Sequence, residues 1–161
     1  MTRYLLLLPL LIGLACAHVP SGPVKYEYED ACQEDIMVGD YLNGKISCDL
    51  CAQYRFSAPC YNGLGLVEIE IYKNLDKAEE YFNKALKRDS DFLQALNNIA
   101  FVYFARQDYE ISIQYLEKVL KLDPSYEDAR ANLIYMLISM GEMDRAEQEA
   151  KKLKVLDNEV R

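Results

Sequence analysis

The sequence predicts an all-α protein, an α-α superhelix built from stacked pairs of helices. From about residue 25 onward the apolar residues recur at helical spacing, and no alternating run is long enough for a useful strand. One pattern of small and apolar residues occurs three times at intervals of 34 residues, and each copy ends at an Asp. A fixed period of this length is typical of helical repeats that stack side by side. We therefore expect a scaffold rather than an enzyme.

Residues 1–16 carry the features of an export signal. Arg3 is their only charged residue, and the apolar run 4–14 is too short to span a bilayer as a mature helix. The run leads into Ala15-Cys16, which resembles the bacterial lipobox, where a small residue precedes the lipidated Cys. Gly13 departs from the lipobox, which usually has Leu at that place. The resemblance implies lipid attachment at Cys16 and a membrane anchor.

Other processing of this leader stays open. Ala15-Cys16-Ala17 also fits the small-x-small rule for ordinary signal cleavage, which would give a soluble periplasmic or secreted protein. A further alternative is that the segment is not cleaved. By resemblance to Gram-negative lipoproteins, Ala17 in place of Asp after the Cys favours sorting to the outer membrane. Residues 17–24 are rich in Pro and Gly and are expected to form a flexible tether. We expect a cell-envelope protein on the periplasmic face.

Residues 93–126 give the clearest copy of the repeated pattern, with small and apolar residues at the packing positions of two helices. These residues are Leu96, Ile99, Ala100, Tyr103, Tyr109, Ser112, Leu116 and Val119. The arrangement resembles the tetratricopeptide repeat, a helix-turn-helix unit of 34 residues. Paired helices approach closely only where side chains are small. The copies 59–92 and 127–160 follow the same pattern, so the resemblance implies about three repeats within residues 59–161.

The segment between the second and third of these copies contains residues that typically end one helix and begin the next. Pro124 is expected to end the preceding helix, because proline cannot continue it. Ser125, with Asp128 three residues later, is expected to form the capped start of the next helix.

Continuing the same register backwards gives a fourth, degenerate unit at 25–58. Gly39-Asp40-Tyr41 falls where the family has its turn, and Gly44 takes a small position. The unit is rich in cysteine, and its cysteines take positions between helices. The alternative is an irregular loop held together by disulfides.

Four cysteines remain after either cleavage, an even number that suits an oxidising compartment. In the repeat fold, Cys32 of a first helix would pack against the second helix that carries Cys48, and Cys51 would lie close to Cys60. The resemblance therefore implies the disulfides Cys32–Cys48 and Cys51–Cys60. Zinc binding stays open, although one Cys-x-x-Cys pair is present instead of two. A redox pair at Cys48 and Cys51 also stays open, although no thioredoxin-like unit surrounds it.

The composition argues against catalysis and against nucleic-acid binding. His18 is the only histidine and lies in the predicted tether, which excludes His-based acid–base chemistry and His-rich metal centres. Gly63-Leu64-Gly65 lacks the third glycine and the preceding strand of a phosphate loop. The net charge is -8, and no basic stripe could meet a phosphate backbone. We expect no enzyme activity, no cofactor, no metal and no nucleic-acid partner.

Stacked helical pairs curve, and the resemblance implies that their first helices line the concave side. The residues expected to face inward there are Val67, Gln94, Asn97, Asn98, Phe101, Phe104, Asn132 and Tyr135. Aromatic rings can take apolar side chains of a peptide while Asn amides bond its backbone. Asn98 and Asn132 match a position where the family often has a peptide-contacting Asn. Asp128, however, stands where family members that clamp a carboxylate have a Lys.

These features predict a membrane-anchored, non-catalytic adaptor that binds a peptide or protein of the cell envelope in its concave groove. One alternative is a structural envelope lipoprotein that self-associates, with Phe101 and Phe104 in a homodimer seam. The same rings could also be ordinary packing residues. A third reading is a protein that uses its four cysteines for redox chemistry or zinc binding.

Overall fold

The structure, a computed structural model, describes residues 27–159, with side chains up to Leu153. The predicted signal, Cys16 and the tether 17–24 lie outside the described residues. Between residues 27 and 159 the chain forms eight helices and no strand. They are α1 (Glu27–Met37), α2 (Tyr41–Tyr54), α3 (Ala58–Glu70), α4 (Leu75–Arg88), α5 (Leu93–Ala105), α6 (Tyr109–Leu122), α7 (Glu127–Ser139) and α8 (Met143–Glu159).

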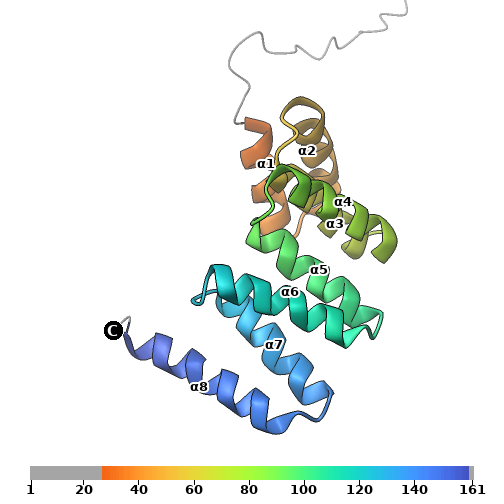
Figure 1. The fold of residues 1–161 in the computed structure, drawn as a ribbon. Helices are drawn as coiled ribbons and strands as arrows, with labels where there is room; N and C mark the ends of the chain where they lie inside the picture. The colour runs from red at the N-terminus through yellow and green to blue at the C-terminus, as the bar shows by residue number, and fades with distance from the viewer. Residues whose placement is uncertain (1–26, 160–161) are drawn as a thin grey trace, which may run out of the picture.

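The eight helices form four pairs, α1–α2, α3–α4, α5–α6 and α7–α8, which stack into an elongated superhelix (Figure 1). Each second helix also packs on the first helix of the next pair. The predicted all-α superhelix is confirmed. None of the helices in the described part is both long and apolar enough to cross a bilayer.

The turn inside each pair contains one residue with a left-handed backbone. These residues are Gly39, Lys73, Gln107 and Gly141, with φ of 77°, 52°, 67° and 79°. They follow one another at the 34-residue period of the sequence. The cysteine-rich segment therefore forms a helical pair with the same turn geometry as the other three pairs.

The start of α7 differs from the sequence prediction. The residue before the helix is Tyr126, whose side chain makes no capping hydrogen bond. The Ser125 hydroxyl and backbone N–H both donate to Oδ1 of Asp123, at 2.6 and 2.8 Å. These two bonds hold the pKa of Asp123 below its ordinary value, because they stabilise the carboxylate. Ser125 therefore stabilises the turn after α6 instead of capping α7.

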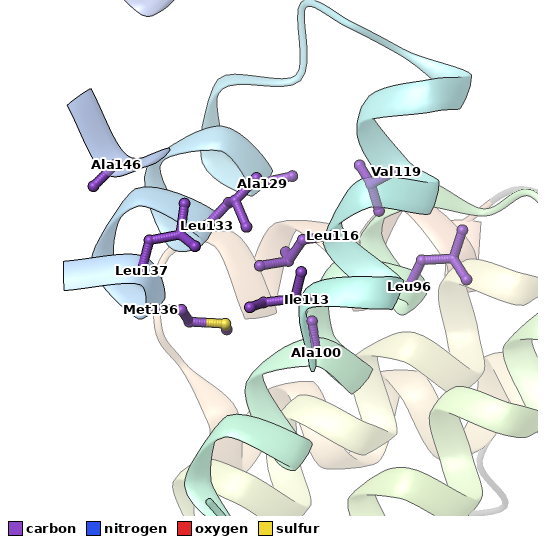
Figure 2. Close-up of a cluster of buried hydrophobic side chains, with 10 residues drawn as sticks. All are labelled: Leu96, Ala100, Ile113, Leu116, Val119, Ala129, Leu133, Met136, Leu137 and Ala146. Atoms are coloured by element: carbon purple, nitrogen blue, oxygen red, sulfur yellow. The ribbon is translucent and has the colours of Figure 1, made fainter. Parts of the chain in front are cut away.

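A continuous apolar core joins the last two helical pairs (Figure 2). It is formed by Leu96, Ala100, Ile113, Leu116, Val119, Ala129, Leu133, Met136, Leu137 and Ala146. Alanines at the contact points let the helix backbones approach, as the repeated small residues predict. The Ser112 hydroxyl, buried in the same region, donates to the backbone oxygen of Ala100 at 2.5 Å.

Two glycines of α3 lie where neighbouring helices approach closely. A Cβ atom on Gly63 would lie 2.5 Å from Sγ of Cys48 and 2.7 Å from Sγ of Cys32. A Cβ atom on Gly65 would overlap the ring of Phe82 in α4. The Gly63-Leu64-Gly65 segment is thus a site of close helix approach within α3.

The four cysteines are fully buried and form the two pairs that the repeat register implies. Cys32 of α1 is bonded to Cys48 of α2, with Cα atoms 4.6 Å apart, and Cys51 of α2 to Cys60 of α3, with Cα atoms 5.5 Å apart. Both Cα separations lie in the usual range for disulfides. The bonds fasten α1 to α2 and α2 to α3, and they replace much of the aliphatic core found between the later helices.

A polar network joins α4 to α5. The Tyr103 hydroxyl donates to Glu79 at 2.8 Å, and its ring stacks on Tyr115 with centroids 5.8 Å apart. Arg106 pairs with Glu79 at 2.5 Å and with Asp76 at 2.6 Å. The hydrogen bond to Glu79 raises the pKa of Tyr103 to about 12, because ionising the phenol would break it.

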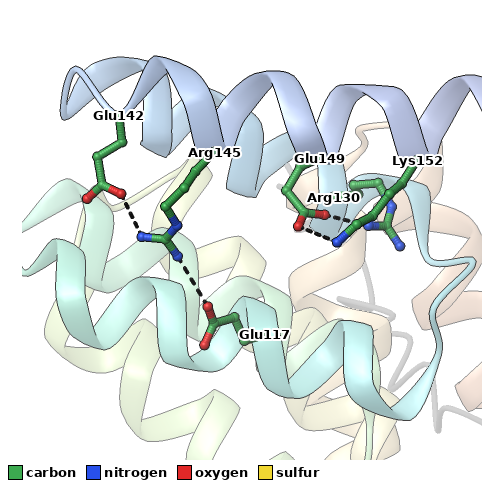
Figure 3. Close-up of polar contacts among 6 residues, drawn as sticks. All are labelled: Glu117, Arg130, Glu142, Arg145, Glu149 and Lys152. Atoms are coloured by element: carbon green, nitrogen blue, oxygen red, sulfur yellow. Dashed lines mark hydrogen bonds and ion pairs between the residues drawn. The ribbon is translucent and has the colours of Figure 1, made fainter.

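The last helix is held by two groups of charged residues (Figure 3). Arg130 of α7 is buried and pairs with Glu149 of α8 at 2.6 Å, and Lys152 pairs with the same carboxylate. Arg145 of α8 reaches Glu117 of α6 at 3.4 Å. A buried Arg requires a partner, so removing Glu149 would cost more stability than removing the exposed Glu117.

Candidate peptide-binding surface

Asparagine side chains link successive first helices to one another. Nδ2 of Asn98 in α5 donates to Oδ1 of Asn62 in α3 at 2.9 Å. Nδ2 of Asn132 in α7 donates to Oδ1 of Asn97 in α5 at 3.0 Å. A primary amide has two N–H donors and one carbonyl acceptor, so each group keeps bonding capacity after one such contact. The two bonds fix the amides in place across three repeats.

Exposed aromatic rings lie on the same first helices as the amides. Phe101 of α5 is 46% exposed and Tyr135 of α7 is 61% exposed. The ring of Tyr135 meets Phe104 edge-on at 5.6 Å between centroids, and Phe104 also contacts Tyr109 at 5.6 Å. Phe104 is itself half-buried and packs against the core. Phe104 therefore supports Tyr135, while Phe101 and Tyr135 present apolar surface to solvent.

A cleft of about 230 Å³ lies at the N-terminal end of this surface, between α1, α3 and α5. Ile36 of α1 and Leu66 of α3 contribute apolar walls, and Asn62 contributes an amide. Gln94 of α5, which is exposed, completes the cleft with Phe92. The cleft adjoins the Asn62–Asn98 bond, so polar and apolar groups are available side by side.

One expected surface residue is in a different place. Val67 is 1% exposed, so it is a core residue and not part of the concave surface. Its position in the repeat is that of Phe101 and Tyr135. A valine side chain is too short to reach beyond the neighbouring residues, whereas an aromatic ring projects past them. We define the candidate surface as Gln94, Asn97, Asn98, Phe101, Asn132 and Tyr135, with Asn62 added.

Asn62 was not predicted from the sequence. It is 9% exposed, and a polar residue here breaks the repeat, because the corresponding residue of the next unit is Leu96. That break is the signal that could have revealed it. A buried amide requires a partner, and Asn98 supplies one.

The cysteine region offers a second site to consider. The carboxylate of Glu29 and the sulfurs of Cys51 and Cys60 lie within 4.8 Å of one another. Both sulfurs are joined in a disulfide, and the thiolate is the form of cysteine that binds metal. The geometry therefore assigns these cysteines a structural role in this oxidised state.

Two family comparisons identify the repeats. Residues 58–92 and 93–126 each match the tetratricopeptide repeat family. Residues 58–126 therefore match two tetratricopeptide repeats, and the two matched segments coincide, within one residue, with two of the units expected from the period. No curated protein is significantly similar in sequence.

Solved structures with the same fold are distant in sequence. The structure of MamA is 18% identical and superposes with a TM-score of 0.70, covering 85% of this chain and 81% of MamA. A mutant of Thermobaculum terrenum O-GlcNAc transferase is 24% identical with a TM-score of 0.64, over 69% of this chain but only 21% of the transferase. The second repeat domain of Spaghetti (RPAP3), bound to an HSP90 peptide, is 21% identical with a TM-score of 0.56, over 62% of this chain and 91% of that domain. At these identities the likeness shows the fold.

Proposed function

We propose that this repeat protein is a non-catalytic adaptor that binds an extended peptide or protein segment along its first helices. The observation that carries the proposal is the combination on α5 and α7 of exposed rings, Phe101 and Tyr135, with amides that are fixed by hydrogen bonds. Fixed amides lose little entropy on binding, and exposed rings gain buried area. The residues of the candidate surface are uncharged, which favours a partner with apolar side chains over a partner with an acidic tail. A related fold, the Spaghetti domain, holds an HSP90 peptide.

The first experiment measures partner capture from envelope extracts by crosslinking and pull-down with the full chain. The Asn98→Ala/Phe101→Ala variant should reduce capture by about tenfold or more, because central contacts carry most binding energy. Circular dichroism should show the helix content unchanged. Ile111→Ala serves as control, because Ile111 is an exposed apolar residue of the second helix α6. Capture that is equal for all three proteins would rule out the surface.

We further propose that the protein is anchored through Cys16 on the periplasmic side of the outer membrane. Three features support this proposal: the lipobox-like end of the leader, the two disulfides formed by the other four cysteines of the chain, and the Pro- and Gly-rich segment 17–24. Labelled fatty acid should be incorporated into the chain, and Cys16→Ser should abolish both labelling and recovery in the outer-membrane fraction. An N-terminus that begins after Ala17 would show ordinary secretion instead.

A further inference from the structure

An aliphatic stripe runs along the outer face of α2. Leu42, Ile46 and Leu50 recur at every fourth residue and so share one side of the helix. Leu42 is 73% exposed and Ile46 is 61% exposed, while Leu50 is partly exposed. The opposite side of α2 carries the residues packed against α1 and α3, including Cys48. The stripe is therefore surface and not core.

Comparison among the four pairs shows that this stripe is exceptional. The second helices begin 34 residues apart, so their positions correspond one to one. Leu42 corresponds to Asp76, Glu110 and Asp144, and Ile46 corresponds to Glu80, Gln114 and Gln148. Leu50 corresponds to a lysine in each of the other pairs. The fold thus accepts polar residues at all three positions, and only this pair leaves an aliphatic row facing solvent.

The charges beside the stripe are arranged for self-pairing. Lys45 and Asp49 lie on one flank, each three residues after a stripe residue, and pair with each other at 2.7 Å. When two copies of α2 meet antiparallel about a two-fold axis between Ile46 and Ser47 along the helix, the same flanks face each other. Lys45 of one copy then stands opposite Asp49 of the other, in both directions. Leu42 likewise stands opposite Leu50, and Ile46 lies next to its own counterpart.

We propose that the outer face of α2 is the seam of an antiparallel homodimer of this protein. Aliphatic contacts supply the attraction, and the reciprocal Lys45–Asp49 pairs fix direction and register. A lipid surface fits less well, because helices that lie on membranes carry mainly Lys and Arg beside their apolar face, whereas Asp40 and Asp49 border this stripe. The seam uses a second helix, so the candidate peptide-binding surface on the first helices stays open in both copies. The inference is independent of the proposed function, and a dimer would present that surface twice.

The first test is sedimentation equilibrium of the full chain over a hundredfold range of concentration. The wild-type chain should form dimers. Leu42→Asp/Ile46→Glu, which installs residues that the other pairs carry at these positions, should sediment as a monomer with unchanged helix content. Ile111→Glu, the matched change on α6, should remain dimeric. All of these chains keep the leader, so the leader contributes equally to any association. A Leu42→Asp/Ile46→Glu variant that still associates would do so through another part of the chain, and this result would overturn the proposal.

The second test reverses the flanking charges. Lys45→Glu alone should raise the dimer dissociation constant roughly tenfold, because two attractive pairs become repulsive. Lys45→Glu/Asp49→Lys should restore the wild-type constant, since the reciprocal pairing is regained with its signs exchanged. A wild-type chain that stays monomeric at every concentration would overturn the proposal. The proposal would also be overturned if Lys45→Glu/Asp49→Lys dimerised no better than Lys45→Glu alone. A third contrary result would be a monomeric wild-type chain that binds lipid vesicles and loses that binding with Leu42→Asp/Ile46→Glu.

Discussion

The turn residues of the four pairs differ in how well they suit a left-handed backbone. Gly39 and Gly141 adopt it without steric cost, whereas Lys73 and Gln107 carry a Cβ atom in the same conformation. Such a conformation costs an L residue about 1–2 kcal/mol. Two of the four turns therefore hold strain that the other two avoid.

Gln107→Gly should raise the free energy of unfolding by about 1 kcal/mol, because the strain is removed and part of the gain is offset by chain entropy. Urea denaturation of the two proteins measures the difference. Gly141→Gln is the mirror control and should lower stability by a similar amount. A Cβ on Gly141 would meet nothing within 4 Å, so the cost of that substitution comes mainly from the left-handed backbone and not from a clash at Cβ. Equal stability of all three proteins would contradict the argument.

Helices α3 and α4 show how two repeats fill equivalent core positions with different residues. Gly65 and Phe82 occupy the repeat positions taken by Ile99 and Leu116 in the next pair. A missing side chain on α3 is compensated by a large ring on α4, and Phe82 is 0% exposed. A close-packed interior requires that the space beside a glycine be filled by a neighbouring side chain.

Gly65→Ala should therefore destabilise the protein by about 1–3 kcal/mol, although alanine is the better helix former, because its Cβ would overlap the Phe82 ring. Chemical denaturation monitored by circular dichroism gives the value. Gly65→Ala/Phe82→Leu should recover part of the loss, since the smaller side chain makes room for the methyl group. Non-additivity in this double-mutant cycle is the expected sign of contact. Additive losses would show that the two residues are not coupled.

The element scale is also where the sequence is most informative. The period predicts the second helices well because small residues such as Ala78, Ser112 and Ala146 must recur wherever backbones meet. The same register implied both disulfides, since it fixes which helices are neighbours. It did not place Val67 or Ser125 correctly. Those outcomes depend on side-chain length and on one local hydrogen-bonded turn, neither of which periodicity encodes.

At the scale of the whole molecule, the two ends of the described superhelix differ. At the C-terminal end, Glu147 and Ala150 of α8 stand at the repeat positions of the buried Ile113 and Leu116. These polar or small residues leave the outer face of α8 without the apolar side chains that pack on a following helix in the earlier pairs. The aliphatic stripe of α2 is the exception near the other end. The 34-residue register shows in the sequence that these positions are polar in the later pairs, but only the structure shows that Leu42 and Ile46 face solvent.

Stability in a stacked protein is the sum of local terms, so the two disulfides should protect only their own neighbourhood. Cys32–Cys48 and Cys51–Cys60 join α1, α2 and α3, while the core from α5 to α8 contains no cysteine. Replacing all four cysteines by Ala should therefore speed amide hydrogen exchange across residues 27–70 by roughly a hundredfold or more, because each of the two cross-links usually contributes about 2–4 kcal/mol. Exchange in residues 93–153 should stay unchanged. A uniform increase along the described helices would show instead that the four pairs unfold as one cooperative unit.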